Sequence, residues 1–455
     1  MSLSRKYLLR FKRLLNAGVN ATIYPLSSLS PRKSSHWVFG HQGGIFAGNS
    51  KYLFLWVTRN RPDIKAVWLT NHRKTVELLH ANGYVAHMRW SISGMLAALR
   101  SKVFVYCHSL ADVNLQLSRG SLRLNLWHGI GLKSTMLGDT GGVVSRHWKY
   151  RKNLISRAMF LDYLKFPDLV VTTSDFMQIH FAQQFKILPD QCPKLGYSRL
   201  DCAADLELKK QAVAIDRNGG FSFNAEGFSE TYIYMPTYRD TGRPFLATAL
   251  PDLQLLSKAL AARSALLYIK LHPRTLANLP ELPSNIQIWP QHFDFYTYLA
   301  DFTGLITDYS SVIYDYIFLR NVGAILYTFD FDEFVGSDRA LLYPYNDNIA
   351  GVRVSTFAQL CQVIEDGSSL LASENTAFVR EKFWGSCVAP VSPNIVGYVE
   401  ISLQQKPVSA DMRRSRLTEQ FRGLANSSLR RRQAANPPVM PIPYASSDVR
   451  PASIK

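Results

Sequence analysis

Short apolar runs alternate with segments of helical spacing along most of this chain, and that alternation limits the folds it can adopt. Strands are predicted at residues 37–39, 66–69, 84–86, 103–106, 122–126, 169–172, 232–235, 266–271, 286–289, 304–306 and 324–327. Helices are predicted at residues 52–57, 75–82, 92–99, 253–263, 295–301, 312–319, 357–366 and 375–383. Because such alternation builds βαβ units, the sequence predicts an α/β chain with mainly parallel sheets.

A polar stretch that contains several glycines, Asp216 to Glu230, divides this pattern into two series. Such a composition is typical of a surface loop or a linker. The chain has 455 residues, which is comfortable for two domains and long for one. We therefore expect an N-terminal domain over residues 35–205 and a C-terminal domain over residues 220–405.

The two ends of the chain depart from this pattern. Residues 1–20 are predicted to form a basic amphipathic helix, in which Lys and Arg alternate with Leu, Phe and Tyr. Such a helix can lie on an anionic membrane surface or dock on its own domain, and both interpretations stay open. Residues 426–455 are rich in Ser, Arg, Gln, Ala and Pro, and they are predicted to be a disordered basic tail.

The charge balance and the cysteines indicate the kind of partner and the compartment. A formal charge of +18 indicates an anionic partner, such as nucleic acid, anionic lipid or a phosphorylated substrate. The five cysteines include no CxxC pair and are odd in number, so we expect a reducing, cytoplasmic compartment rather than a disulfide framework. No apolar run is long enough to predict a transmembrane helix, and no signal peptide is recognisable.

The stretch from Gly304 to Leu319 predicts a strand, a polar turn and a helix. Ser310 and Ser311 stand where this helix begins. Their hydroxyls can cap the helix, and they also lie beside free backbone N–H groups at the positive end of the helix dipole, which can bind phosphate. Taken alone, the stretch favours capping, whereas the cationic clusters at other strand ends shift the interpretation towards phosphate binding.

Two predicted strands are followed by a polar turn at the position where open α/β sheets bind ligands. After the strand at 122–126, His128 precedes a glycine and can act as a general base, and Lys133 adds positive charge. After the strand at 232–235, Thr237 and Arg239 offer a hydroxyl and a planar guanidinium to a phosphate. The alternatives are a structural histidine and a surface pair between Arg239 and Asp240.

A third strand end carries three cationic side chains within five residues. Lys270, His272 and Arg274 follow one another here, and Pro273 ends the strand. Such a cluster suits an oligophosphate ligand, although a solvated turn is also possible.

Several familiar catalytic motifs are missing from the chain. It contains no GxxxxGK[ST] loop, no GxGxxG fingerprint, no HExxH and no GxSxG elbow. Asp330 and Asp332 form a DxD-like pair that only weakly suggests a divalent cation, and an acidic surface turn is the commoner outcome. We therefore expect no metal site and no cofactor, although a divalent cation is possible.

Four motifs in this order give the chain a resemblance to a known family. They are WHGIGLKS at 127–134, YMPTYRD at 234–240, IKLHPR at 269–274 and ITDYSSVIYDY at 306–316, with further matches at 37–54 and at GYSRLD, 196–201. The chain resembles the CDP-glycerol glycerophosphotransferase family, which includes teichoic acid primases and polymerases and capsule polymerases. The resemblance implies a GT-B fold, in which two Rossmann-like domains with parallel sheets face a central cleft.

The resemblance also implies a reaction and a role for each motif. Glycerol phosphate or ribitol phosphate would pass from a CDP-polyol to a hydroxyl of a lipid-linked or polymeric cell-surface glycan, and CMP would leave. His128 would be the base and His272 would act at the diphosphate. The other implied donor-site residues are Thr237, Arg239, Lys270, Arg274, Ser310, Ser311 and Asp315, and the implied acceptor-side residues are Gly43, Asn49, Ser50 and Lys133.

A lipid-linked acceptor implies that the enzyme is cytoplasmic and peripheral on the inner face of the cell membrane, which favours a membrane role for residues 1–20. Two departures from the family pattern concern specificity. Ile130 and Gly131 replace the usual Thr-Pro of the first motif, and Ser198 replaces the usual Pro of the GYSRLD segment.

Two other functions remain possible from the sequence. A GT-B glycosyltransferase that uses a nucleotide sugar for cell-envelope polysaccharide synthesis would share the fold and the diphosphate site. A non-catalytic nucleic-acid-binding protein would explain the charge, but the cations gather at strand ends and in the two termini, so we expect no nucleic acid.

Overall fold

The structure is a computed structural model, and it describes residues 3–132, 135–139, 142–151, 153–272, 275, 280–338, 341–367 and 374–405. Residues 1–406 form one compact unit. The predicted tail at 426–455 lies outside the described residues.

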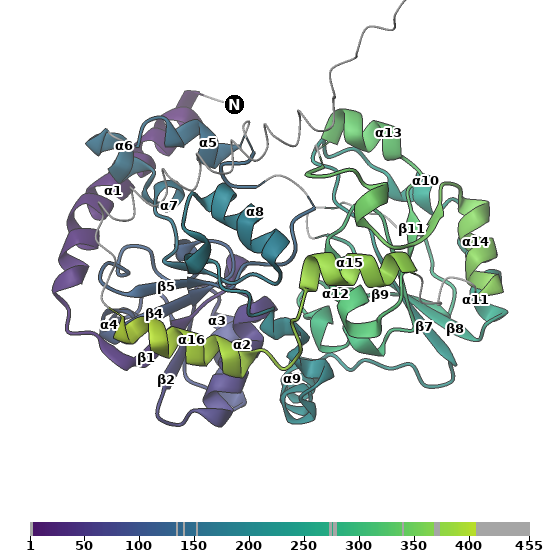
Figure 1. Ribbon diagram of the computed structural model, residues 1–455, viewed down its shortest axis with the longest axis horizontal. Helices are drawn as coiled ribbons and strands as arrows, with labels where there is room; N and C mark the ends of the chain where they lie inside the picture. Colours follow the sequence, from purple (N-terminus) through teal and green to yellow (C-terminus); the bar gives the residue numbers. More distant parts are fainter. Residues whose placement is uncertain are drawn as a thin grey trace, which may run out of the picture. The chain divides into compact units, whose positions relative to one another are not determined.

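The first sheet contains six parallel strands in the order β3-β2-β1-β4-β5-β6 (Figure 1). They are β1 (Lys33–Phe39), β2 (Lys65–Thr70), β3 (Ala86–Met88), β4 (Ser101–Tyr106), β5 (Leu122–Asn125) and β6 (Leu169–Val170). This is the strand order of the Rossmann fold, and the direction of winding reverses between β1 and β4. Ligands bind beside such a reversal, at the carboxyl ends of the strands.

The second sheet repeats the same connectivity, with the order β12-β11-β10-β7-β8-β9. Its strands are β7 (Glu230–Met235), β8 (Ala265–Ile269), β9 (Ile286–Ile288), β10 (Gly304–Thr307), β11 (Ala324–Tyr327) and β12 (Gly351–Val354). All neighbouring pairs are parallel, and the winding reverses between β7 and β10. The predicted α/β class with two Rossmann-like parallel sheets is therefore confirmed.

Helices connect the strands of both sheets. In the first half they are α1 (Leu3–Leu26), α2 (Gly48–Asn60), α3 (Arg73–Ala81), α4 (Ile92–Arg100), α5 (Val143–Trp148), α6 (Leu154–Met159), α7 (Leu161–Leu164), α8 (Asp175–Phe185) and α9 (Leu206–Asn218). In the second half they are α10 (Leu246–Ala249), α11 (Leu253–Ala261), α12 (Val312–Arg320), α13 (Phe331–Glu333), α14 (Phe357–Asp366), α15 (Glu374–Trp384) and α16 (Ser392–Gln404).

Strand β1 shows why continuous apolar runs become central strands here. Trp37, Val38 and Phe39 are each at most 1% exposed, although their side chains alternate between the two faces of the sheet. Trp37 and Phe39 belong to one core cluster and Val38 belongs to another. Burial on both faces is what a parallel sheet covered by helices requires.

Helix α16 returns from the second half of the chain to the first, where it contacts α2 (yellow-green in Figure 1). Asp201 fixes its start, because the carboxylate accepts hydrogen bonds from the backbone N–H groups of Val391 and Ser392 at 2.8 and 2.9 Å. The sequence places residues up to 405 in a C-terminal domain, yet this last helix packs on α2 of the first half. The domain boundaries themselves stay a prediction.

Other differences from the sequence expectations are local. The predicted strand at 84–86 begins at Ala86, the predicted helix at 295–301 consists of two 3₁₀ turns, and α9 occupies the start of the predicted linker. The first helix extends to Leu26, and its Asn20 side chain donates to the Ala158 carbonyl at 2.7 Å, which docks this part of α1 on the first half. Within the described ranges, no helix is long and apolar enough to cross a membrane.

Candidate active site

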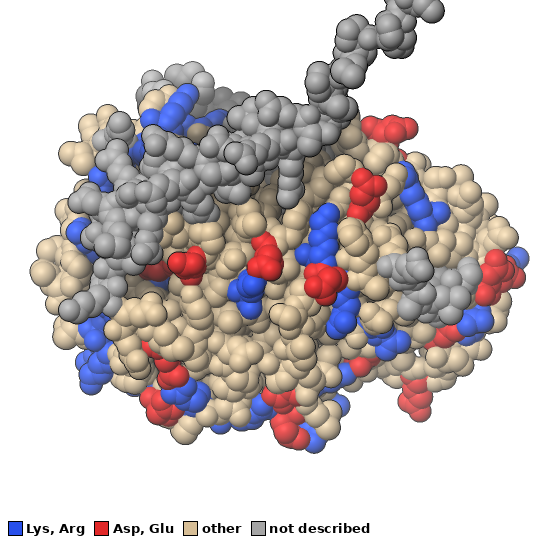
Figure 2. Space-filling model, viewed as in Figure 1, with Lys and Arg blue, Asp and Glu red and all other residues tan. Residues whose placement is uncertain are grey.

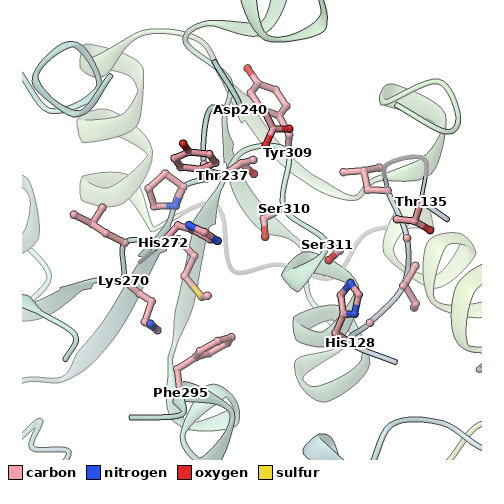
Figure 3. A pocket seen from close by; sticks show the side chains of 18 of the residues that line it. His128, Thr135, Thr237, Asp240, Lys270, His272, Phe295, Tyr309, Ser310 and Ser311 are labelled. Atoms are coloured by element: carbon pink, nitrogen blue, oxygen red, sulfur yellow. The ribbon is translucent and has the colours of Figure 1, made fainter. Parts of the chain in front are cut away.

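A pocket of about 570 Å³ lies where loops from the two sheets meet. Its walls come from the loop after β5 and from the turns after β7, β8 and β10, so it includes the winding reversal of the second sheet. Figure 3 shows the predicted residues that line it together: His128, Thr237, Lys270, His272, Ser310 and Ser311. The structure thus brings six of the predicted site residues to one cavity.

The start of α12 gives this pocket a set of hydrogen-bond donors. Ser311 occupies the N-cap position, but its side chain makes no capping bond, and the Ser310 hydroxyl lies 3.5 Å from the Val312 nitrogen. Capping by these serines is therefore weak, which leaves their hydroxyls available at the positive end of the helix. The expected arrangement for an anion is present, since both hydroxyls line the cavity.

Thr237 faces the same space from the end of β7. Its backbone N–H donates to the Asp308 carboxylate at 2.8 Å, which ties the turn after β7 to the turn after β10. Its hydroxyl oxygen is buried and makes no hydrogen bond with any residue that the structure describes. A buried hydroxyl without a partner costs free energy, and an oxygen-rich ligand in the pocket would supply that partner.

His128 lies in the loop after β5, and its imidazole is exposed towards the pocket. The Nδ1 atom lies 3.4 Å from the Cys107 carbonyl oxygen, which can only accept, so Nδ1 carries the proton and Nε2 keeps its lone pair. The surrounding protein atoms, and then His108 and Arg199, lower the pKa of His128 below its ordinary value of 6.5. At neutral pH the ring is therefore neutral and able to accept a proton.

Asn49 and Ser50 hold this loop from behind and do not line the pocket. Asn49 is 1% exposed, and its amide donates to the carbonyls of Leu126 and Trp127 at 3.2 and 2.9 Å. The Ser50 hydroxyl lies 3.1 Å from the sulfur of Cys107. Both side chains are buried in this structure, and their predicted place on the acceptor side stays a prediction.

Arg199 connects the His128 loop to α12. Its guanidinium donates to the His128 carbonyl at 2.7 Å and forms a buried ion pair with Asp315. The Tyr296 hydroxyl donates to the same carboxylate at 2.9 Å, and its ring lies 4.2 Å from the guanidinium carbon. Asp315 was predicted near the donor, but its carboxylate is fully buried against Arg199 and does not line the pocket.

The sequence gives Arg199 no role, although it lies in the GYSRLD segment that resembles the family. The Arg199 guanidinium also limits which residue can occupy position 129. A Cβ at Gly129 would lie 2.5 Å from the Arg199 guanidinium, and the φ of +128° is one that side chains rarely adopt. Position 129 therefore needs glycine for both space and backbone conformation.

Arg239 also departs from its predicted role as a phosphate ligand. It is fully buried, with bidentate bonds of 2.8 and 2.9 Å to Asp330 and a 3.0 Å ion pair with Asp308. The guanidinium is therefore committed to internal carboxylates below the pocket and does not line it. Asp330, the first member of the DxD-like pair, is also bound by Arg243 at 2.6 Å. Within the described residues, no group of His, Cys, Asp and Glu side chains is arranged to hold a metal ion.

The remaining predicted residues lie in different places. Lys270 is partly buried, which lowers its pKa, although Asp294 opposes the shift. His272 stands 5.1 Å from the Tyr238 ring, measured between ring centroids. Gly43 lines a separate cavity beside the first sheet. Lys133 and Arg274 lie outside the described residues.

The surface charge does not add a second candidate site on the face shown in Figure 2. Lys and Arg side chains are interspersed there with Asp and Glu side chains. The cationic groups that point to a ligand are those at the strand ends.

Comparisons with known proteins show which family and which structures this chain is similar to. Residues 22–386 match the model of a family described as CDP-Glycerol:Poly(glycerophosphate) glycerophosphotransferase. The chain is similar to the wall teichoic acid polymerase TagF in a histidine-to-asparagine variant soaked with CDPG, with 17% identity, a TM-score of 0.68, and coverage of 88% of this chain and 97% of that chain. For TagF without a named substitution the identity is 18% and the TM-score is 0.64, over 88% and 96% of the two chains. A search of curated proteins finds no match. The structural likeness confirms the GT-B fold that the sequence predicts.

Proposed function

This chain belongs to the CDP-glycerol:poly(glycerophosphate) glycerophosphotransferase family, and we propose how its pocket performs the transfer and on which acceptor. The enzyme uses CDP-glycerol as the donor of glycerol phosphate. The proposed acceptor is a hydroxyl of a lipid-linked or polymeric cell-surface glycan of the teichoic acid type. The observation that carries the proposal is that His128 and the start of α12 line one cavity.

The donor's diphosphate would lie at the start of α12. The backbone N–H groups there and the hydroxyls of Ser310 and Ser311 can donate to phosphate oxygens, and the Thr237 hydroxyl can do the same. Lys270 and His272 approach from the end of β8 and can stabilise charge on the bridging oxygen as CMP leaves.

His128 would act on the acceptor from the opposite wall. The acceptor oxygen attacks the β-phosphorus, and its proton passes to the lone pair of His128 Nε2. The bond from the β-phosphorus to the bridging oxygen breaks, and CMP leaves with that oxygen. The new phosphodiester joins glycerol to the acceptor. A base held neutral on one side and donors for phosphate on the other are the two requirements of this displacement.

A donor screen tests this function. The enzyme is incubated with an acceptor-bearing membrane fraction and with CDP-glycerol, CDP-ribitol or UDP-sugars, and the release of CMP and UDP is measured. We expect CMP release with CDP-glycerol. Release of UDP without CMP would instead support the nucleotide-sugar glycosyltransferase. The proposal names no cofactor besides the CDP-polyol, and turnover in EDTA and in Mg²⁺ measures whether a divalent cation takes part.

We propose that the enzyme is localised at the inner face of the cell membrane, where it would bind peripherally. A lipid-linked acceptor requires the enzyme to visit that surface. Helix α1 carries the basic residues Arg5, Lys6, Arg10, Lys12 and Arg13 in its first half, which would favour anionic lipid.

A further inference from the structure

Five adjacent strands of the first sheet each deliver an imidazole or a guanidinium just after their last residue. In the spatial order β3, β2, β1, β4 and β5, these side chains belong to Arg89, His72, His41, His108 and His128. Each residue lies one to three positions past the end of its strand. The five positions are far apart in the sequence, so only the strand order brings them into a row.

Two cavities follow this row and join it to the donor pocket. Arg89, His72, His41 and His108 line a cavity of about 350 Å³ at the winding reversal of the first sheet. His108 and His128 line a second cavity of about 370 Å³. His128 also lines the donor pocket, and the ring centroids of His108 and His128 are 6.0 Å apart. The shared residues make the three cavities neighbours along the carboxyl edge of the sheet.

The first of these cavities is lined by polar side chains with hydrogen-bonding groups that the described residues do not use. The Nε atom of Arg89 is buried and makes no hydrogen bond with any described residue, while one Nη atom holds the Ala111 carbonyl. The rings of His72 and His108 are exposed. The ring of His41 is partly exposed, and its Nδ1 donates to the Gln42 carbonyl at 2.8 Å, so Nε2 of the neutral ring can accept a hydrogen bond from a hydroxyl.

The carboxylates near the row do not oppose an anion equally. Asp112 lines the first cavity but is 8% exposed, and it accepts from the backbone N–H groups of His108 and Ser109 at 2.9 and 3.2 Å. Its charge is therefore held by the loop. Asp162 and Lys165 both line the second cavity, and they bring charges of opposite sign. The first cavity also holds charges of both signs, but three imidazoles line it beside Arg89 and its carboxylate is already hydrogen-bonded, so it is the more favourable place for an anion.

We propose that Arg89, His72, His41 and His108, here called the edge row, bind the phosphodiester backbone of the acceptor whose terminal hydroxyl reaches His128. This inference rests on the proposed function, and it deepens it by assigning the acceptor a path and a direction. Neighbouring strands are about 4.8 Å apart, so the row of four spans roughly 14 Å. Guanidinium and imidazole N–H groups at this spacing suit repeated phosphates, and neutral imidazoles can also accept from the hydroxyls between them.

The test compares two acceptors of equal length, a short oligo(glycerol phosphate) and the uncharged oligoglycerol. For each we measure kcat/KM by CMP release, and we measure the Kd of the oligo(glycerol phosphate) by calorimetry on the full chain. The wild-type enzyme is expected to prefer the charged acceptor by about tenfold or more, since its phosphates would gain charge-assisted hydrogen bonds from the edge row. In His72→Gln/Arg89→Gln this preference is lost and the Kd rises by a similar factor.

The controls separate this inference from a loss of folding and from the reaction itself. The matched variant His292→Gln/Arg73→Gln changes an exposed imidazole and an exposed guanidinium outside the edge row, and it should keep the preference. Arg89 also holds a backbone carbonyl, so His72→Gln alone gives a second variant with an exposed side chain. Equal use of both acceptors by the wild type, or an unchanged preference and Kd in the edge-row variants, overturns the inference. If neither acceptor supports CMP release from CDP-glycerol, the proposed function fails, while the calorimetric Kd still decides the inference.

Discussion

The two sheets share one connectivity but differ in the side chains that follow the C-terminal ends of their strands. The edge of the first sheet carries imidazoles, including His128. The edge of the second sheet carries the hydroxyls of Thr237, Ser310 and Ser311 and the start of α12. The strand order fixes where a ligand can bind in each half, and the side chains after each strand decide which chemical group it holds.

Arginines mark a second difference between the halves. Arg239 forms ion pairs with Asp308 and Asp330 of its own half. It therefore stabilises the loops that follow the strands of the second sheet. Arg199 follows the first sheet in the chain but pairs with Asp315 of α12. One arginine therefore stabilises a single edge, and the other fixes the two edges relative to each other.

The largest effect is expected when the base is removed. His128→Ala should lower the rate of CMP release by about 10²–10⁴-fold, because a positioned general base contributes about that much. His272→Ala tests the second edge in the same assay, where transfer should also be lost. The thermal unfolding midpoint of each variant should stay near that of the wild type, and near-normal turnover in either would contradict the role assigned to it.

The two buried ion pairs can be compared by removing one carboxylate from each. Asp315→Ala leaves the Arg199 charge buried without its partner and should cost about 3–5 kcal/mol of unfolding free energy. Asp330→Ala should cost less, because Arg239 keeps Asp308. Of the two, only Asp315→Ala should also change kcat/KM strongly, since Arg199 holds the His128 loop. Denaturant unfolding and CMP release measure both effects, and equal losses of activity would remove the distinction between the arginines.

The hydroxyls at the start of α12 should have a smaller effect. Ser310→Ala and Ser311→Ala each remove one donor to the diphosphate, so kcat/KM for CDP-glycerol should fall about tenfold or somewhat more. Ser222→Ala, in an exposed loop, is the control. Unchanged kinetics in both α12 variants would mean that the serines do not contact the donor.

The pH dependence of the reaction tests the environment of His128. The pKa of this histidine lies below its usual value of 6.5, so the ring stays neutral and able to accept a proton as the pH falls through that value. Activity that depends on the neutral ring is retained there and is lost only as the pH falls through the lowered pKa. We therefore expect kcat/KM to stay level between about pH 8 and about pH 6. A tenfold loss per pH unit that starts near the usual histidine value would contradict this.

The smallest effect on catalysis is expected at the N-terminus. Deletion of residues 1–16 removes the basic half of α1 and keeps Asn20, which docks the helix on the first half. Sedimentation with anionic liposomes should decrease, while CMP release from CDP-glycerol with a water-soluble acceptor should change little. Liposome binding equal to that of the full chain would remove the membrane role from this helix.

The fold could be predicted from the sequence because its signals are local. Apolar runs such as 103–106 and 324–327 are buried on both faces, and the polar turns after them lie at the predicted sheet edges. Elements with weak local signals are not predicted from the sequence. Strand β12 has an exposed arginine and glycine, and α5 to α7 are too short to show a clear helical period.

Residues that line the pocket could be predicted where one motif supplies both the strand and the side chain that follows it, as at His128, Lys270 and Ser310. A residue's role was not predicted where it depends on a distant partner. The burial of Arg239 requires Asp330, and the role of Asn49 requires the carbonyls of a loop far along the chain. The edge row requires the strand order itself, because each of its residues is unremarkable in its own segment.

The pair between Arg199 and Asp315 also limits how the pocket can open. A motion that moves the His128 loop away from α12 must separate two charges that are at most 3% exposed. Such a motion would give up a buried ion pair and its hydrogen bonds, so the closed arrangement is favoured. Donor and acceptor would therefore enter along the C-terminal ends of the strands of their own sheets, while the His128 loop and α12 stay together.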